Sequence, residues 1–365
     1  MAKVEAQNKS FSILIGIIVL FGLIILSSAG VVEGQNKFGS AQFYLVHQIL
    51  FGLLPGLALY LILSRIKYTH WRHFSLAILL GALGLMVLVL VPSLGVVANG
   101  AQRWLALGPI SFQPSEFLKL GMIIYLSAWL SRKDSKMKDW SYSTAPFFVI
   151  LGFVGLLLVL QPDMGTLGMI LIIALAMYFS AGAKMSQIFM VLLVLSILAA
   201  VLIYLQPYQW DRITSFANPG SDIQGKSYHI RQAIISIGSG GIFGVGFGKS
   251  TQKINFLPEP VGDSIFAVLV EELGLIGGGA LILLFLALMV KIIKIAKRAP
   301  DSFSQLFVIG VGVWIIGQAF INIGAISGLI PLTGIPLPLV SYGGTSLVSL
   351  LAALGIVNNV ARYAK

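Results

Sequence analysis

Long apolar stretches recur along the whole chain and constrain its fold more than any other feature. They run for roughly 18 to 25 residues, the length that a helix needs to cross a hydrocarbon layer about 30 Å thick. Strands of a membrane barrel would instead give alternating segments of roughly 10 residues. Charged residues make up only 10% of the chain, against about 25% in a soluble domain. The pattern predicts an all-α, polytopic membrane protein.

We expect about ten transmembrane helices by this length criterion, in a single membrane domain over residues 1–365. A large outer loop, roughly residues 206–262, separates the seventh helix from the eighth. The expected helices are centred near Val19, Leu54, Leu85, Ile124, Leu156, Ile172, Val194, Leu281, Trp314 and Leu351.

Most basic residues fall on one side of such an arrangement. With an even number of spans, 16 of the 24 Lys and Arg residues lie on the side of the two termini, mostly in short loops. Because cytoplasmic loops carry an excess of Lys and Arg, both termini are predicted to be cytoplasmic. This orientation and anionic lipids explain the net charge of +11, so no nucleic-acid partner is needed. The 16 residues are Lys3, Lys9, Arg65, Lys67, Arg72, Arg132, Lys133, Lys136, Lys138, Lys184, Lys291, Lys294, Lys297, Arg298, Arg362 and Lys365.

The remaining eight basic residues lie on the outer side or at its boundary. Positive charge there suggests an anionic ligand, and lipid phosphate is the obvious candidate at a membrane surface. The alternative is that these residues pair with Glu33, Asp211, Asp222 and Glu259. The eight are Lys37, Arg103, Lys119, Arg212, Lys226, Arg231, Lys249 and Lys253.

Cysteine and histidine usage narrows the chemistry. The chain has no cysteine, which excludes disulfides, thiol catalysis and Cys-based metal sites. The four histidines are scattered, and the metalloprotease motif H-E-x-x-H does not occur. His70 and His73 lie three residues apart at an expected helix end, where an interfacial pair is commoner than a metal site.

The fourth span carries an acid and a base within its apolar run. Gln113 and Pro114 mark its start, since Pro suits a first helical turn. Glu116 and Lys119 follow three residues apart, within reach of an ion pair on one helical face. Such residues inside a membrane helix face a bundle interior or a polar cavity. They either neutralise each other to lock helix packing, or position a charged loop residue or the substrate.

Other polar residues stand at the ends of spans. Asp163 in "QPDMGTL" is expected to cap a helix. The run "GSGGIFGVGFGKS" matches neither nucleotide-binding glycine motif and has no βαβ unit around it, so its glycines indicate tight turns. Three prolines in "PLTGIPLPLVSYGGTSL" break the helix before Ser341, at the wall of an outward cavity. Asn322 is expected to hydrogen-bond between helices.

The stretch "FLPEPVGDSIFAVLVEELG" concentrates acids at the start of the eighth span. At 100° per residue, Asp263, Glu271 and Glu272 cannot form one cluster on this helix. Asp263 lies at the mouth of the span, where it either caps the helix or faces water and substrate. Glu271 and Glu272 lie deeper and need partners such as Lys119, backbone donors or protons.

Four segments, in order, resemble the SEDS family (shape, elongation, division and sporulation proteins), typified by FtsW and RodA. They are "GAQRWLALGPISFQPSEFLKL", "QPDMGTL", "GSGGIFGVGFGKSTQKINFLPEPVGDSIFAVLVEELGLIG" and "TGIPLPLVSYGGTSL". The resemblance covers nearly the whole chain, and "LGPISFQPSE" and "GVGFGKSTQK" look more like FtsW than RodA. It implies an inverting peptidoglycan glycosyltransferase that polymerises lipid II on the outer face of the bacterial cytoplasmic membrane. It also implies a class B penicillin-binding protein as partner, among other division or elongation proteins.

The resemblance assigns roles to particular residues. The family's essential acid, in a segment that usually reads H-T-D-F-I-F-A, falls on Asp263, which we expect to be the catalytic base. This chain has Val261 where that segment has histidine, which argues against a base or metal ligand at that position. The family's acid and lysine of the fourth span fall on Glu116 and Lys119, and its outer-loop arginine falls on Arg103, so these three are expected to bind or position substrate. From the residues themselves, we expect the same role for Gln113, Arg212, Lys249 and Ser341, and a structural role for Asp163, Glu271, Glu272 and Asn322. A divalent cation, Mg²⁺ or Mn²⁺, is the one cofactor left open.

Two other function classes fit parts of the pattern. A lipid II flippase, or another carrier of a lipid-linked precursor, would also have intramembrane charges and proline-broken helices. Against it, the chain shows no paired half-repeat, and its charges gather toward the outer side. A scaffold that only recruits a transpeptidase would leave Asp263 and Arg103 dispensable.

Overall fold

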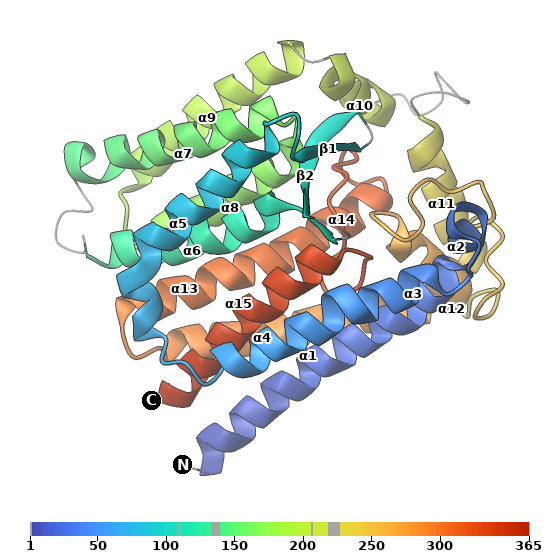
Figure 1. The fold of residues 1–365 in the computed structure, drawn as a ribbon, viewed down its shortest axis with the longest axis horizontal. Helices are drawn as coiled ribbons and strands as arrows, with labels where there is room; N and C mark the ends of the chain where they lie inside the picture. Colours follow the sequence, from blue (N-terminus) through green and yellow to red (C-terminus); the bar gives the residue numbers. More distant parts are fainter. Residues whose placement is uncertain are drawn as a thin grey trace.

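The computed structural model describes residues 2–98, 100–107, 110–132, 139–205, 207–217 and 227–364. The predictions for Lys133, Lys136, Lys138, Asp222, Lys226 and Lys365 fall outside these ranges. Within them, the chain forms a bundle of helices with one small sheet (Figure 1).

The helices follow one another from the N-terminus to the C-terminus with short connections. The α-helices are α1 (Ala2–Ala29), α2 (Val31–Phe38), α3 (Phe43–Gln48), α4 (Leu54–Leu63), α5 (Thr69–Val89), α6 (Pro114–Ser131), α7 (Ala145–Leu160), α8 (Met164–Ser180), α9 (Met185–Leu205), α10 (Pro207–Ala217), α11 (Tyr228–Gly240), α12 (Ile265–Lys297), α13 (Ser302–Gly312), α14 (Gln318–Ile326) and α15 (Gly344–Tyr363). Three π-helical turns, η1 (Ile49–Leu53), η2 (Trp140–Thr144) and η3 (Val313–Gly317), join or precede α-helices.

All ten expected span centres lie in these helices. In the described part of the chain, seven segments are long and apolar enough to cross a membrane: Lys9–Ala29, Phe43–Leu63, Thr69–Val89, Met185–Tyr204, Ile265–Lys297, Ser302–Ile326 and Gly344–Tyr363. The other three centres lie in the shorter apolar helices α7 and α8 and in α6, which contains Glu116 and Lys119. The prediction of an all-α, multi-pass membrane protein is confirmed.

The last helix, α15, forms the centre of the bundle. It packs against α1, α4, α6 and α13, and most of its side chains are buried. The segment Ser302–Ile326 is also largely buried, whereas α9 is the most exposed of the seven long spans. The burial of α13, α14 and α15 explains why polar side chains on these helices must find partners within the protein.

A small sheet that we did not predict stands between α5 and α6. Its strands β1 (Gly95–Ala98), β2 (Ala101–Leu107) and β3 (Ile110–Phe112) are antiparallel in the order β1-β2-β3. Gly95 pairs with Leu105, which in turn pairs with Phe112 on the other side. Strands this short carry a weak sequence signal, which the long helical runs around them obscured.

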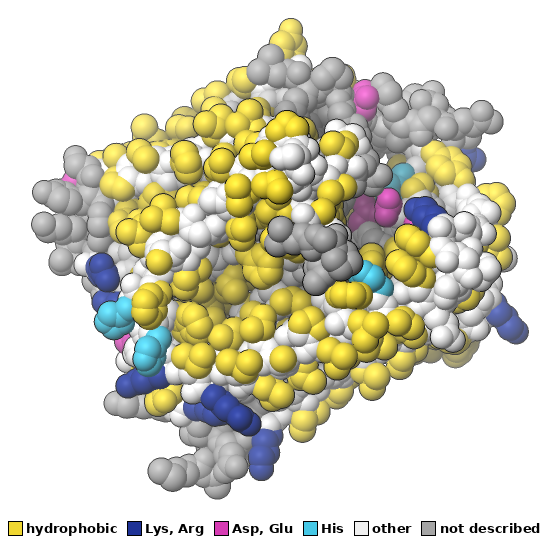
Figure 2. Space-filling model, in the orientation of Figure 1, with side chains coloured by type: hydrophobic (Ala, Val, Ile, Leu, Met, Phe, Trp, Pro, Cys, Tyr) yellow, Lys and Arg dark blue, Asp and Glu magenta, His cyan; other side chains and the backbone are white. Residues whose placement is uncertain are grey.

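The described part of the outer loop contains two helices, α10 and α11, which the sequence analysis did not predict. Helix α11 packs along α12. Both termini lie at one end of the bundle, whereas α2 and α11 lie at the other (Figure 1). On the face shown in Figure 2, several Lys, Arg and His side chains lie toward the end where the termini lie.

Candidate active site

Asp263 lies directly before α12, where the outer loop meets the membrane domain. The N-cap of α12 is Ser264, so Asp263 does not have the capping role that was its alternative. Two other segments hold its backbone: Asn322 Nδ2 of α14 donates to the Asp263 carbonyl oxygen at 2.8 Å, and Ser341 Oγ donates to the Gly262 carbonyl oxygen at 2.7 Å. The aspartate is therefore fixed by its main chain, which leaves the carboxylate available.

The carboxylate of Asp263 is desolvated but incompletely satisfied. Its side chain is 13% exposed, and Oδ1 has no hydrogen-bond partner among the described residues. Burial raises the pKa of Asp263 to about 6, although the positive charge of Arg212 and a hydrogen bond from the Ser264 side chain oppose this rise. A carboxylate with a pKa near the working pH is suited to accept a proton.

Arg212 comes to this aspartate from α10. Its Nη1 donates to the carbonyl oxygen of Thr333 at 3.0 Å, in the proline-broken segment before α15. The guanidinium thus links the outer loop to that segment while its charge acts on Asp263.

His229 is the residue at this site that the sequence did not lead us to expect. It projects from α11, with Nε2 2.7 Å from Ser264 Oγ and 3.9 Å from Asp263 Oδ1. Burial lowers the pKa of His229 to about 4, so the imidazole is neutral at pH 7. Val261, which stands at the position of the usual histidine, is buried in the core.

The Glu116–Lys119 pair lies beneath this region and ties α6 to the buried span α13–α14. The two side chains are in contact at 2.8 Å and almost fully buried. Lys119 also donates to Gln318 Oε1 at 3.2 Å, and Gln318 Nε2 donates to the Pro336 carbonyl oxygen at 2.9 Å. One helical turn further on, Asn322 donates to the Ile335 carbonyl oxygen at 2.8 Å. The ion pair therefore supports the same proline-broken segment that borders Asp263.

Arg103, Gln113 and Asp163 meet at the turn before α8. Asp163 accepts the Thr166 backbone N–H as the N-cap of α8, and it also accepts Gln113 Nε2 at 3.3 Å. The Arg103 guanidinium donates to the carbonyl oxygens of Gln161 and Pro162. In this arrangement the three side chains brace the turn and join the sheet to α8.

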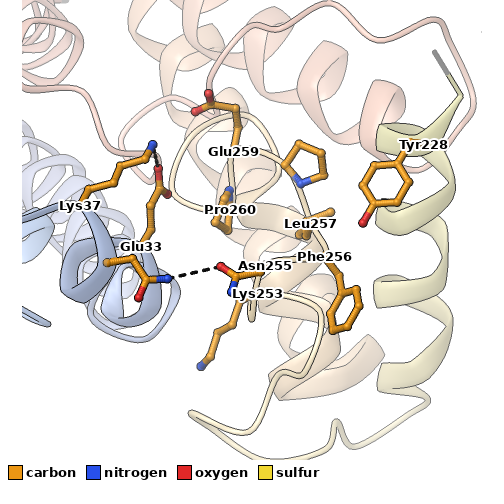
Figure 3. A pocket seen from close by; sticks show the side chains of 11 residues that line it. Glu33, Lys37, Tyr228, Lys253, Asn255, Phe256, Leu257, Glu259 and Pro260 are labelled. Atoms are coloured by element: carbon orange, nitrogen blue, oxygen red, sulfur yellow. Dashed lines mark hydrogen bonds and ion pairs between the residues drawn. The ribbon is translucent and has the colours of Figure 1, made fainter. Parts of the chain in front are cut away.

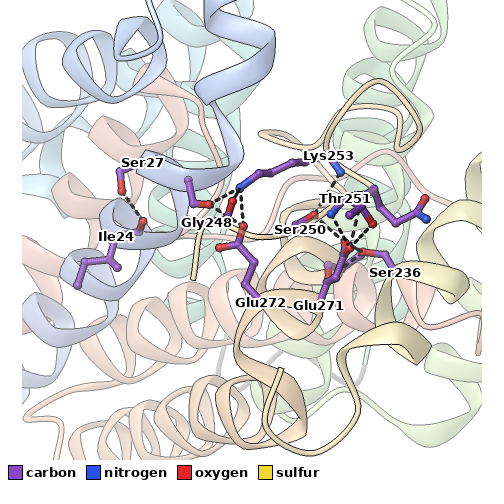
Figure 4. A network of polar contacts seen from close by, with 12 residues as sticks. Ile24, Ser27, Ser236, Gly248, Ser250, Thr251, Lys253, Glu271 and Glu272 are labelled. Carbon is purple, nitrogen blue, oxygen red and sulfur yellow. Dashed lines mark hydrogen bonds and ion pairs between the residues drawn. The ribbon is translucent and has the colours of Figure 1, made fainter. Parts of the chain in front are cut away.

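Glu271 and Glu272 form separate polar networks within α12 (Figure 4). The Glu271 carboxylate accepts the hydroxyls of Ser236 and Ser250 and the Thr251 backbone N–H, at 2.7 to 2.9 Å. Glu272 pairs with Lys253 at 2.6 Å. The partner of Glu272 is therefore Lys253 of the outer loop, whereas Lys119 pairs with Glu116.

A break in α12 lets the glycine-rich loop join these networks. Gly274 has φ +67, and a side chain there would collide with the backbone of Ile242. The backbone N–H groups of Val245 and Gly246 donate to the carbonyls of Glu271 and Glu272, at 2.9 and 3.1 Å. The loop thus satisfies backbone groups that the broken helix leaves open, as irregular structure at membrane depth requires.

A pocket of about 250 Å³ lies between α2 and the loop that leads to Asp263. Glu33 and Lys37 of α2 pair within it at 2.5 Å, and Glu259 of the loop completes its wall (Figure 3). The Glu259 carbonyl accepts the backbone N–H groups of Gly262 and Ser264, so this wall continues into the site. Lys249, expected near substrate, is exposed in the glycine-rich loop.

On the face shown in Figure 2, a few acidic side chains with a basic and a histidine side chain beside them interrupt an otherwise apolar surface.

We compared the chain with known protein families, curated proteins and solved structures. Residues 8–365 match the model of the FtsW/RodA/SpoVE family, described as "Cell cycle protein". The chain belongs to this family.

Curated SEDS relatives include stage V sporulation protein E of Bacillus subtilis, which is 40% identical over 96% of this chain and 95% of its own length. The probable peptidoglycan glycosyltransferase FtsW of Nitrosococcus halophilus is 39% identical over 93% of this chain and 88% of its own. Among solved structures, RodA of Thermus thermophilus has a TM-score of 0.72 at 28% identity, covering 97% of this chain and 96% of RodA. A chain from a structure described as a "peptidoglycan synthase complex" that coordinates "polymerization and crosslinking" has a TM-score of 0.80 at 29% identity, covering 97% of both chains.

In this SEDS protein, the site therefore joins Asp263, Arg212 and His229 from three elements. Sequence reasoning missed His229 because 35 residues separate it from Ser264, and no spacing rule connects them. One signal could have pointed to His229. Val261 stands where the family's segment usually has histidine, so a histidine from another segment was worth considering for this site.

Proposed function

We propose that this protein is a peptidoglycan glycosyltransferase that polymerises lipid II into glycan strands. The observation that carries the proposal is Asp263, a desolvated carboxylate with a free oxygen, held by Asn322 and Ser341 in a chain of the FtsW/RodA/SpoVE family. Relatives named as probable peptidoglycan glycosyltransferases match the chain along nearly its whole length.

Asp263 acts as the general base. The acceptor sugar attacks through its 4-hydroxyl, which is weakly acidic and needs a positioned base in the transition state. The Asp263 carboxylate takes this proton while the hydroxyl oxygen bonds to the donor's anomeric carbon. The anomeric bond to the diphosphate breaks, and the diphosphate leaves with the electron pair. Attack from the opposite face turns the α-linked donor into a β-glycosidic product.

Arg212 is the residue best placed to balance charge on the leaving diphosphate, since its charge already acts on Asp263. Arg103 is the second candidate, and it would have to give up its carbonyl partners at Gln161 and Pro162. The described residues contain no group of three or more His, Cys, Asp or Glu side chains that could hold a metal. A bound Mg²⁺ or Mn²⁺ stays a prediction, and the reaction above is written without it.

The location and partner follow from the same proposal. Both termini are cytoplasmic, and Asp263, at the other end of the bundle, faces the outer side, where lipid II is exposed after its transfer across the membrane. The basic residues near the termini support this orientation. A class B penicillin-binding protein would cross-link the strands that this protein makes. The similar chain from a peptidoglycan synthase complex supports such a pairing.

The test is polymerisation of fluorescent lipid II by the purified full-length protein with its partner, in vesicles or detergent. We expect polymer from the unaltered protein, and at least about 100-fold less from Asp263→Asn, which keeps the shape but cannot accept the proton. Polymer from Asp263→Asn at the normal rate would refute the assignment of the base. Movement of lipid II across the vesicle membrane that continues in Asp263→Asn, without polymer from either protein, would favour the carrier function.

A further inference from the structure

Gln48 of α3 is a buried amide that the proposed reaction leaves without a task. The residue is 2% exposed, and both ends of its side chain bind one turn near the start of α15. Its Oε1 accepts the Gly343 backbone N–H at 2.9 Å, and its Nε2 donates to the Ser341 carbonyl oxygen at 3.4 Å. Because a buried amide is costly without partners, this pairing ties α3 to that turn specifically.

The neighbouring residue of α3, His47, binds the same turn through its central side chain. The Tyr342 hydroxyl lies 3.0 Å from His47 Nδ1. The π-helical turn η1, which follows α3, also approaches closely, since a methyl group at Gly52 would lie 3.2 Å from Gly344 Cα. The N-terminal part of the chain therefore holds the turn Ser341–Gly343 by its backbone on both sides of Tyr342 and by the Tyr342 hydroxyl.

This turn in turn holds the two residues that precede Asp263. The Tyr342 backbone N–H donates to the Val261 carbonyl oxygen at 2.9 Å, and Ser341 Oγ donates to the Gly262 carbonyl oxygen at 2.7 Å. The contacts of α3 thus reach Asp263 through a single intermediate, the turn, and every hydrogen bond on the way is between residues that are far apart in the sequence.

The two peptide planes beside the Asp263 Cα are both fixed in this way. Ser341 holds the plane before Asp263 through the Gly262 carbonyl oxygen. Asn322 of α14 holds the plane after it through the Asp263 carbonyl oxygen, at 2.8 Å. Since a peptide unit is planar, holding both planes sets both main-chain torsions of Asp263, from which its carboxylate projects.

We propose that Gln48 and His47 are positioning residues for glycan polymerisation, which hold the turn Ser341–Gly343 and through it the main chain of Asp263. The inference rests on the proposed function, because it takes Asp263 as the base. A misplacement of about 1 Å can cost about 100-fold in rate. Contacts that only packed α3 against the bundle would instead lower stability and leave the rate of the folded protein unchanged.

The experiment compares Gln48→Met with a matched control, Asn359→Leu. Methionine has nearly the shape of glutamine but neither hydrogen-bonding group. Asn359 is also 2% exposed, and its amide also binds two backbone groups, the Ser64 carbonyl oxygen and the Tyr68 N–H, both at 2.9 Å. It lies near the C-terminal end of α15, away from Asp263. For each full-length variant with its partner, kcat and KM for lipid II are measured per folded protein after size-exclusion chromatography, together with the melting temperature.

For Gln48→Met, we expect kcat to fall about tenfold or more, with KM within about twofold of the unaltered value. We expect Asn359→Leu to lose a similar amount of melting temperature and to keep a normal kcat. His47→Phe keeps a ring of similar size and removes the contact with the Tyr342 hydroxyl. Its kcat is expected to fall about threefold, as for the loss of one hydrogen bond, and it carries the test if Gln48→Met does not fold.

A double variant tests whether the effect passes through the turn. Gln48→Met and Ser341→Ala break successive contacts in one path, so their effects are not expected to be independent. We expect kcat of Gln48→Met/Ser341→Ala to lie within about twofold of the slower single variant.

Three results would overturn the inference. These are a normal kcat in both His47→Phe and folded Gln48→Met, an equal loss of kcat in Asn359→Leu, or losses that multiply in the double variant. The proposed function fails by different results, namely no polymer from the unaltered protein or polymer at the normal rate from Asp263→Asn.

Discussion

The buried pair between Glu272 and Lys253 offers a quantitative test of how the outer loop is anchored. Lys253 Nζ contacts Glu272 Oε1 at 2.6 Å, Ser28 Oγ at 2.7 Å and the Gly248 carbonyl oxygen at 2.9 Å. Glu272 is completely buried. Its only other hydrogen bond in the described part of the chain comes from Ser28 Oγ. Replacing Lys253 with Met therefore leaves a buried carboxylate with a single donor.

The expected cost of Lys253→Met is about 3–5 kcal/mol, the range seen when one partner of a buried pair is removed. For a chain of this size, that corresponds to a melting temperature lower by about 4–7 °C. The double variant Lys253→Met/Glu272→Met removes both charges and leaves apolar side chains of similar length. We expect it to lie within about 2 kcal/mol of the unaltered protein, because replacing a whole buried pair is often nearly neutral.

The assay is thermal unfolding of the detergent-solubilised protein, followed by size-exclusion chromatography of the soluble fraction. It is applied to Lys253→Met, Glu272→Met and the double variant. Lys291→Met, at a partly buried lysine bonded to Ser10 Oγ at 2.7 Å, serves as the control for loss of a lysine without a buried acid. A double variant as unstable as Lys253→Met would refute the argument, since the cost would then come from lost packing of the lysine and not from the stranded carboxylate.

Three further predictions concern the site. The polymerisation rate should be maximal well above pH 6 and should fall as the pH drops through about 6, because burial raises the pKa of Asp263 to about 6 and the base must be ionised. Initial rates that stay constant down to pH 4.5 would contradict this. Arg212→Ala should raise the pH of half-maximal rate, because it removes a positive charge that lowers the pKa of Asp263, whereas Arg212→Lys should leave that pH nearly unchanged. Equal pH profiles for the two variants would exclude a charge effect. Asn322→Leu should lower kcat by about tenfold or more, because it removes the donor to the Asp263 carbonyl. It should also lower the free energy of unfolding by about 1–3 kcal/mol for each buried carbonyl left without a donor. A normal kcat in a destabilised variant would show that Asn322 does not position Asp263.

Contacts between residues close in sequence could be predicted before the structure was known. The i,i+3 spacing of Glu116 and Lys119 was enough to place them on one helical face, where they pair. Asp163 was expected to cap a helix, and it accepts the Thr166 backbone N–H at 3.2 Å. Helix geometry is the same in every protein, so such contacts depend only on local spacing.

The apolar runs were also enough to predict a multi-pass helical membrane protein, because the length of an apolar run and the thickness of a bilayer are independent of how the helices pack. The tertiary structure decided which helices meet. It brought His229 to Asp263 and Lys253 to Glu272, and it placed Ser28 of α1 beside Glu272, from which it is 244 residues away. Such contacts depend on the shapes of many side chains at once, since buried surfaces must interdigitate closely. For that reason no pattern within a single segment could reveal them.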